Sequence, residues 1–192
     1  MKKIDLLRHG RPEGGEVFRG ATDHPLTPEG WSQMKQACQD KKWDLIVTSP
    51  MKRCQEFAEN LVELCKVDML IADDFREFNF GRWENQPTEK VFKEDYEHLK
   101  GMWSDPMNFV APDGEALIDF EARVLKAWFG CLARKEENIL VVCHGGVIRI
   151  LLKEVLGLPF QNINRIDVPY ASMSRITATL EEPYTYQLTA HG

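Results

Sequence analysis

Ile4-Asp5-Leu6-Leu7-Arg8-His9-Gly10 is a mostly apolar run that stops on a cation, an imidazole and a glycine. The same order recurs at residues 139–146, which read Ile-Leu-Val-Val-Cys-His-Gly-Gly. Such runs are typical of buried parallel strands, whose carboxyl ends lie at the sheet edge where open α/β sheets bind their ligands. We therefore expect the imidazoles of His9 and His144 to share a pocket.

The composition is ordinary for a globular protein. Of the 192 residues, 43% are hydrophobic and 28% are charged, so we expect one domain, residues 1–192, with a sizeable core. The net charge of −6 argues against a general affinity for nucleic acid or anionic membranes. Any anion site must therefore be local.

From the sequence we expect neither export nor membrane insertion. No stretch reaches the roughly 20 apolar residues of a membrane span, and Met1 to Asp5 leads into a strand instead of a signal-peptide core. The cysteines contain no Cys-x-x-Cys pair and leave an odd one: Cys38, Cys54, Cys65, Cys131 and Cys143. We expect a cytoplasmic protein whose cysteines are reduced core residues.

Apolar spacing and cap residues predict the order of the elements. Strands are indicated at 4–8, 44–48, 67–71 and 139–143, with further strands near 176–180 and 184–188. Spacings of three and four indicate helices from Pro28 to Cys38 with Thr27 as N-cap, from the cap Ser49-Pro50 to Cys65, from Asp113 or Gly114 to Cys131, and from Gly146 to Leu156 closed by Gly157. This alternation predicts an α/β fold.

Residues 83–110, called the cover segment below, interrupt the alternation. They are rich in aromatic side chains: Trp83, Phe92, Tyr96, Trp103 and Phe109. We expect an irregular or helical excursion from the sheet whose aromatic faces offer a stacking surface to a flat ring.

Five polar residues follow predicted strands: Arg8, His9, Arg53, Glu77 and His144. A parallel sheet would gather them at one edge. Arginine presents forked donors that match phosphate oxygens and stays charged, so phosphate is the natural ligand. Arg53 also lies in the first turn of its helix, where the backbone favours an anion. A neutral imidazole is a competent nucleophile toward phosphorus, and we assign this role to His9.

Other interpretations of these residues are open at this point. Glu77 lies between aromatic residues, which favour a protonated carboxyl and suit a general acid, but a structural ion pair with Arg76 or Arg82 is the alternative. A Cys143 nucleophile is disfavoured because adjacent residues of a strand point to opposite faces. A zinc site at the two strand-end histidines is disfavoured by the arginines beside them. The remaining histidines are interpreted as structural or surface residues: His24, His98 and His191.

Five segments, in this order, resemble the histidine phosphatase family, which includes the cofactor-dependent phosphoglycerate mutases: LLRHG (6–10), RGATDHPLTPEG (19–30), SPMKRCQEFA (49–58), REFNFGRWE (76–84) and VVCHGGVIR (141–149). The resemblance covers nearly the whole chain. It implies a phosphoglycerate mutase-like, three-layer α/β/α sandwich with a mostly parallel central sheet. In relatives a segment such as 83–110 covers the active site, and here it is shorter than in the mutases.

The resemblance also implies a reaction, a metal-independent phosphomonoester hydrolysis that needs no cofactor. His9 would attack the phosphoryl group in line, and water would hydrolyse the resulting phosphohistidine. Arg8, Arg53 and His144 would hold the equatorial oxygens, where charge concentrates. Glu77 would protonate the leaving oxygen and then take a proton from the water.

Further positions are candidates for ligand contacts. The amide of Gly145, at the start of a helix, is a candidate phosphate donor. Arg19 and Gly20 match substrate-contacting positions of the family, although Arg19 is alternatively a solvated loop arginine. Arg11 stands where many relatives carry an acidic or polar residue, and an asparagine common in this loop is missing. The contacts to the leaving group therefore depart from the family pattern.

Additional motifs resemble the bacterial α-ribazole-5′-phosphate phosphatases of cobalamin biosynthesis: LLRHGRPEGG (6–15), WSDPMNF (103–109) and HGGVIR (144–149). The expected partner is thus a small-molecule phosphomonoester, with α-ribazole 5′-phosphate as the best single candidate. The alternatives are a phosphoglycerate mutase or sugar bisphosphatase, and a non-catalytic sensor of a phosphate ligand. The short cover segment argues against a mutase. Intact His9 and Glu77 argue against a sensor, because binding alone requires neither.

Overall fold

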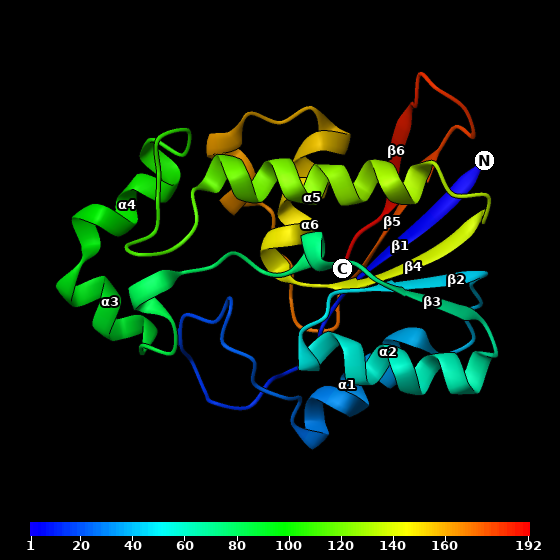
Figure 1. Ribbon diagram of the computed structural model, residues 1–192, viewed down its shortest axis with the longest axis horizontal. Coiled ribbons are helices and arrows are strands. Elements are labelled where there is room, and N and C mark those ends of the chain that lie inside the picture. The colour runs from blue at the N-terminus through cyan, green and yellow to red at the C-terminus, as the bar shows by residue number, and fades with distance from the viewer.

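The computed structural model describes residues 1–192 and is built on a six-stranded sheet with the order β3-β2-β4-β1-β5-β6 (Figure 1). The strands are β1 (Lys2–Arg8), β2 (Leu45–Thr48), β3 (Asp68–Ile71), β4 (Asn138–Cys143), β5 (Met173–Ala178) and β6 (Tyr186–Ala190). The first four run parallel to one another, whereas β5 and β6 pair in the antiparallel sense. The prediction of an α/β fold with a mostly parallel central sheet is confirmed.

Helices cover both faces of the sheet and complete three layers (Figure 1). Helices α1 (Pro28–Cys38) and α2 (Lys52–Cys65) lie on one face, and α5 (Leu117–Leu132) and α6 (Gly145–Leu156) lie on the other. Successive strand residues alternate between two apolar cores, because side chains of a strand point to opposite faces. Leu7 packs in the core of α1 and α2, and its neighbour Leu6 packs in the core of α5 and α6.

Several predicted helix ends are confirmed by cap geometry. The hydroxyl of Thr27 accepts a hydrogen bond from the amide of Gly30 at 3.0 Å, with Pro28 as the first residue of α1. Helix α6 ends at Gly157, whose φ of 62° lies in the left-handed region that glycine adopts without steric cost.

Three sequence-based expectations are wrong. Ser49 does not cap α2, which begins at Lys52 after Met51, because the serine side chain faces the sheet edge instead. Helix α5 begins at Leu117, later than expected, because residues 110–116 form a tight turn closed by a bridge between Val110 and Ala116. Cys65 is exposed at the end of α2, whereas the other four cysteines are buried as expected and all five are free.

The cover segment is helical, as expected, and extends from the sheet on the left in Figure 1. The short helix η2 (Gly81–Trp83) leads into it, and it contains α3 (Thr88–Glu94) and α4 (Tyr96–Ser104). Two more short 3-10 helices are η1 (Asp73–Phe75) after β3 and η3 (Phe160–Arg165) after α6. No helix in the structure combines the length and the apolar character that crossing a membrane requires.

The strand register brings the carboxyl ends of three strands together. Arg8 at the end of β1 lies opposite Cys143 of β4, and Thr48 of β2 lies opposite Val142. Backbone pairing continues one residue further, since the amide of His9 donates to the carbonyl of Cys143 at 3.0 Å. The residues that follow β1, β2 and β4 are therefore neighbours.

Candidate active site

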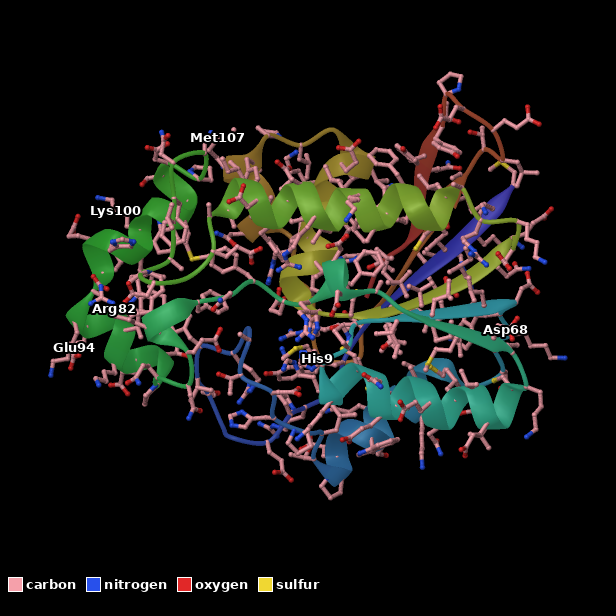
Figure 2. The ribbon with its side chains drawn as sticks, in the orientation of Figure 1. His9, Asp68, Arg82, Glu94, Lys100 and Met107 are labelled. Atoms are coloured by element: carbon pink, nitrogen blue, oxygen red, sulfur yellow. The ribbon has the colours of Figure 1, made fainter.

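The imidazoles of His9 and His144 lie side by side at this edge, with ring centroids 5.3 Å apart. The two residues are 5% and 0% exposed. Figure 2 shows His9 in the middle of the molecule, between the sheet, whose far end Asp68 marks, and the cover segment, which carries the labels Glu94, Lys100 and Met107. The strand-end pattern in the sequence predicts that His9 and His144 lie close together, and in the structure their rings are neighbours.

The environment of His9 fixes which of its nitrogens can react. Nδ1 lies 2.8 Å from the carbonyl oxygen of Gly10. Since a carbonyl can only accept, Nδ1 carries the hydrogen and Nε2 keeps a lone pair. Burial, together with the charges of Arg53 and Arg8, holds the pKa of His9 well below its usual 6.5. His9 is therefore a neutral imidazole with a nucleophilic Nε2 at neutral pH.

His144 is held by a residue that the sequence analysis assigned elsewhere. Its Nε2 lies 2.7 Å from the hydroxyl of Ser49, the expected helix cap. Burial and the nearby Arg53 lower the pKa of His144 well below 6.5. Ser49 follows β2 directly, just as the two histidines follow their strands, so the same strand-end signal identifies it.

Arg53 is completely buried beside the histidines. Its two terminal nitrogens donate to the carbonyls of Thr22 and Gly20, at 2.8 and 2.9 Å. Its Nε is a buried donor without a protein acceptor. The guanidinium is therefore fixed in place by neutral groups that leave its charge uncompensated.

The loop that holds Arg53 is itself fixed by Glu84, which the sequence analysis missed. The carboxylate of Glu84 accepts the amides of Gly20, Ala21 and Thr22, at 2.8 to 3.2 Å. Burial alone would raise the pKa of Glu84, but the hydrogen bonds from Thr22 and from backbone amides lower it overall. A Cβ on Gly20 would lie 1.6 Å from the carbonyl oxygen of Phe78, so only glycine fits there. The amide of Gly20 thus points to Glu84 and its carbonyl to Arg53.

Arg8 is held between β1 and the loop before β5. One terminal nitrogen donates to the carbonyl of Val168 at 2.5 Å, and the guanidinium carbon lies 4.1 Å from the ring centroid of Tyr170. Tyr170 also lies beside His9, with ring centroids 5.7 Å apart. A Cβ built on Gly145 would lie 3.3 Å from Nε of Arg8, so the start of α6 abuts this guanidinium. Nothing in the sequence pattern marks Tyr170, a loop residue outside every motif.

Glu77 reaches the same edge from the loop after η1. Its two carboxylate oxygens accept the amides of Phe78 and Gly146, both at 3.0 Å. A Cβ on Gly146 would lie 2.3 Å from Glu77 Oε1, so this glycine is required for the close approach. The carbonyl of Glu77 accepts from Arg123 at 3.1 Å, which ties the loop to α5.

The structural alternative for Glu77 is wrong. Arg76 pairs with Asp73 and Arg82 pairs with Asp113, each at 3.1 Å, and neither contacts the Glu77 carboxylate. Glu77 is therefore a carboxyl group at the site with amide donors as its partners.

The two loop arginines behave differently. Arg19 is half-buried, lines the cavity described below, and donates to the carbonyls of Glu13 and Gly15 at 2.7 Å. Arg11 pairs with Glu29 at 2.9 Å on the exposed surface. Arg11 is thus compensated outside the cavity, and Arg19 is available inside it.

A cavity of about 830 Å³ extends from the sheet edge to the cover segment. Its polar wall comprises Arg8, Arg19, Glu77, Thr88, Arg149, Asn164 and Arg165, and its apolar wall includes Phe92, Leu99, Met102 and Trp103. Trp83 and Phe109, expected to offer stacking faces, are instead buried in the core. Of the five aromatic residues expected as a stacking surface, Phe92 and Trp103 line this cavity.

The thiol and metal alternatives find no support in the geometry. Burial raises the pKa of Cys143 well above its usual 9.0, and burial likewise raises that of Cys54, so neither thiol is poised to ionise. No group of three or more histidine, cysteine, aspartate or glutamate side chains is arranged to hold a metal ion.

Comparison with known proteins connects this fold and its paired histidines to one family. The chain belongs to the histidine phosphatase superfamily, branch 1, whose family model matches residues 4–189. It is 26% identical over 181 residues to a protein of Hydrogenobacter thermophilus whose name provisionally assigns it to the phosphoserine phosphatases, covering 92% of this chain and 89% of that one. This family and its phosphatase members identify the chain as a phosphoric monoester hydrolase.

Two further relatives differ in their names. A Yersinia pestis protein, provisionally named a phosphoglycerate mutase, is 28% identical over 182 residues, covering 92% of this chain and 85% of that one. Among solved structures, the α-ribazole phosphatase from Shigella flexneri superposes with a TM-score of 0.82 over 97% of this chain and 95% of that one, at 24% identity. At this identity the structural likeness establishes the shared fold and no substrate.

The lowered pKa of His9 makes stability depend on pH. Below pH 6.5 a histidine in the unfolded chain binds a proton that buried His9 does not, so stability is complete above 6.5 and falls with pH until the folded pKa is reached. Replacing His9 by asparagine should therefore reduce the loss of unfolding free energy between pH 6.5 and 5.5 by about 1 kcal/mol. Urea denaturation of both proteins at these pH values measures the difference. Equal losses in the two proteins would show that His9 is not held neutral.

Proposed function

We propose that this protein is a metal-independent phosphomonoesterase that acts through a phosphohistidine on His9. The observation that carries the proposal is the hydrogen bond from Nδ1 of His9 to Gly10, which leaves Nε2 as a nucleophile between two uncompensated guanidinium groups. Arg8 and Arg53 supply positive charge where a phosphoryl group would meet Nε2. Because guanidinium groups provide this charge, the mechanism requires no metal ion.

The first half-reaction forms the covalent intermediate. The lone pair of His9 Nε2 forms a bond to phosphorus while the bond to the ester oxygen breaks and its electron pair leaves with that oxygen. Arg8, Arg53 and His144 bind the equatorial oxygens, and the Gly145 amide adds a donor. The Gly10 carbonyl stabilises the positive charge that the phosphorylated ring acquires, because it accepts from Nδ1.

The second half-reaction returns the enzyme to its starting state. Glu77, in its protonated form, donates a proton to the leaving oxygen in the first step and then takes one from the attacking water. Water forms the new bond to phosphorus, and the electron pair of the phosphorus–nitrogen bond returns to His9. The amides of Phe78 and Gly146 orient the Glu77 carboxyl for both transfers.

Two substrate classes fit within this proposal. The resemblance to the α-ribazole-5′-phosphate phosphatases favours a nucleoside-like 5′-phosphate, which would place its ring against Phe92 and Trp103. The arginines of the polar wall favour a phosphomonoester with an additional acidic group, as in a phosphoglycerate or a sugar bisphosphate. A place in cobalamin biosynthesis and a cytoplasmic location stay predictions from the sequence.

His9→Ala should abolish turnover of 4-nitrophenyl phosphate in the presence of EDTA, because Nε2 of His144, the other imidazole at the site, is already hydrogen-bonded to Ser49. The wild-type protein, quenched during turnover of a ³²P-labelled ester, should carry acid-labile, alkali-stable label that is absent from the variant. Melting curves check that both proteins are folded. Label that persists on His9→Ala would exclude His9 as the nucleophile, and inactivation of the wild type by EDTA would exclude the metal-independent mechanism.

Glu77→Gln should slow esters with alkyl leaving groups roughly 100-fold or more, and 4-nitrophenyl phosphate far less, because nitrophenolate leaves without a proton. Gly146→Ala should show the same selectivity, because its methyl group would displace Glu77 Oε1. The measurement is kcat on glycerol 3-phosphate and on 4-nitrophenyl phosphate for each variant. Equal slowing of both esters would remove Glu77 from the role of general acid.

A further inference from the structure

The arginines of this protein divide into two groups by their partners. Six form ion pairs with carboxylates: Arg11, Arg76, Arg82, Arg123, Arg134 and Arg175. The other five have no ion-pair partner: Arg8, Arg19, Arg53, Arg149 and Arg165. Four of these line the active-site cavity, and the fifth, Arg53, is buried behind it beside His9. Every arginine outside the site is neutralised by a carboxylate, whereas no arginine at the site has a carboxylate partner.

Four of the five unpaired arginines are held by backbone carbonyls: Arg8, Arg19, Arg53 and Arg149. Arg8 donates to Val168, and Nε of Arg149 donates to the carbonyl of Ile166 at 3.0 Å. A carbonyl oxygen satisfies a donor without cancelling its charge. Glu77 is the single carboxylate on the cavity wall, and its oxygens already accept two backbone amides.

The positive charge of the unpaired arginines at the cavity exceeds what one phosphoryl group balances. A phosphomonoester carries at most two negative charges near neutral pH, whereas the cavity wall holds four guanidinium groups and one carboxylate, with the buried guanidinium of Arg53 behind it. The excess occurs in a chain whose net charge is −6, so it does not follow from composition. A ligand with more negative charge than a single phosphate matches the site better.

Arg149 lies where such a charge would extend beyond the phosphate. A Cβ on Gly145 would lie 3.3 Å from Nε of Arg8 and 3.4 Å from Nη1 of Arg149, so the two guanidinium groups flank the first residue of α6. Arg165 reaches the same cavity from η3. The proposed phosphate donors Arg8 and Gly145 thus lie beside Arg149, and Arg165 lines the same cavity.

We propose that Arg149 and Arg165 form a second anion subsite, which binds an acidic group on the leaving-group side of the substrate. The substrates are then small phosphomonoesters that carry a second anionic group, either a carboxylate or another phosphate. This inference rests on the phosphomonoesterase function proposed above for the same site. Arg149 is the principal residue of the subsite, because it is half-buried and fixed by Ile166.

Matched substrates test the subsite directly. 3-Phosphoglycerate differs from glycerol 3-phosphate by a carboxylate in place of a hydroxymethyl group, and fructose 1,6-bisphosphate differs from fructose 6-phosphate by a second phosphate. The wild type should favour at least one acidic member over its neutral partner by tenfold or more in kcat/KM. Arg149→Met should reduce that ratio to about threefold or less, and Arg149→Lys should keep part of it. Arg134→Met, which removes an arginine paired with Glu136 outside the cavity, should leave the ratio unchanged.

Three kinetic results would overturn the subsite. They are similar kcat/KM values for both members of both pairs, an acid preference that survives in Arg149→Met, and a tenfold advantage of α-ribazole 5′-phosphate over every acidic ester. Activity on 4-nitrophenyl phosphate in the same assays shows independently whether the phosphatase proposal holds.

A binding measurement keeps the subsite testable even without turnover. Calorimetry on folded His9→Ala should show the favoured acidic ester binding at least tenfold more tightly than its neutral partner. Adding Arg149→Met should remove most of that difference. If no ester is hydrolysed but this difference is found, the phosphatase proposal fails while the subsite stands. Equal affinities of both members of each pair would overturn the subsite by itself.

Discussion

The parallel pairing of β1 with β4 is the constraint on which the site depends. Its register sets Arg8 opposite Cys143, so the next residue of each strand, His9 and His144, emerges at the same height of the sheet edge. Leu6 and Val141, which lie opposite each other in this pair, are completely buried. A slip of one residue would turn these apolar side chains to the wrong core, so packing of the sheet and placement of the imidazoles are specified together.

Features with local causes were predictable from the sequence. The two strand-end histidines, the cap at Thr27 and the stop at Gly157 each depend on a few consecutive residues, and the structure agrees with all of them. Ser49 was misassigned because a serine between a strand and a helix satisfies two local rules, and only the distance to His144 decides between them. The late start of α5 has a similar origin, since Pro112-Asp113-Gly114 marks a turn but does not show how many residues separate the turn from the helix, which begins at Leu117.

The supporting residues were not predictable, because their contacts join distant parts of the chain. Glu84 binds the amide of Gly20 across 64 positions of sequence, and Arg8 binds Val168 across 160. Neither contact leaves a periodic or spacing signal in one sequence. The motif REFNFGRWE indicated that residues 76–84 matter. Only the structure shows that its first glutamate, Glu77, binds the amide of Gly146 in the first turn of α6, while its last one, Glu84, fixes the loop that holds Arg53.

The choice of acceptors explains how the fold tolerates several cations in a small volume. A buried guanidinium without partners costs several kcal/mol, and pairing it with a carboxylate is the usual remedy. At Arg123 the protein uses that remedy, with Glu115 at 2.6 Å, because this arginine only has to hold a loop. At Arg53 it uses two carbonyls instead, which satisfy the donors and fix the geometry but leave the positive charge in place. Burial and the same positive charge together lower the pKa of His9 and keep it neutral, since a buried protonated imidazole would lose its hydration and be repelled by Arg53 and Arg8. The uncompensated arginines thus act on both reactants. They attract an incoming anionic substrate, and they help to keep the lone pair of His9 unprotonated.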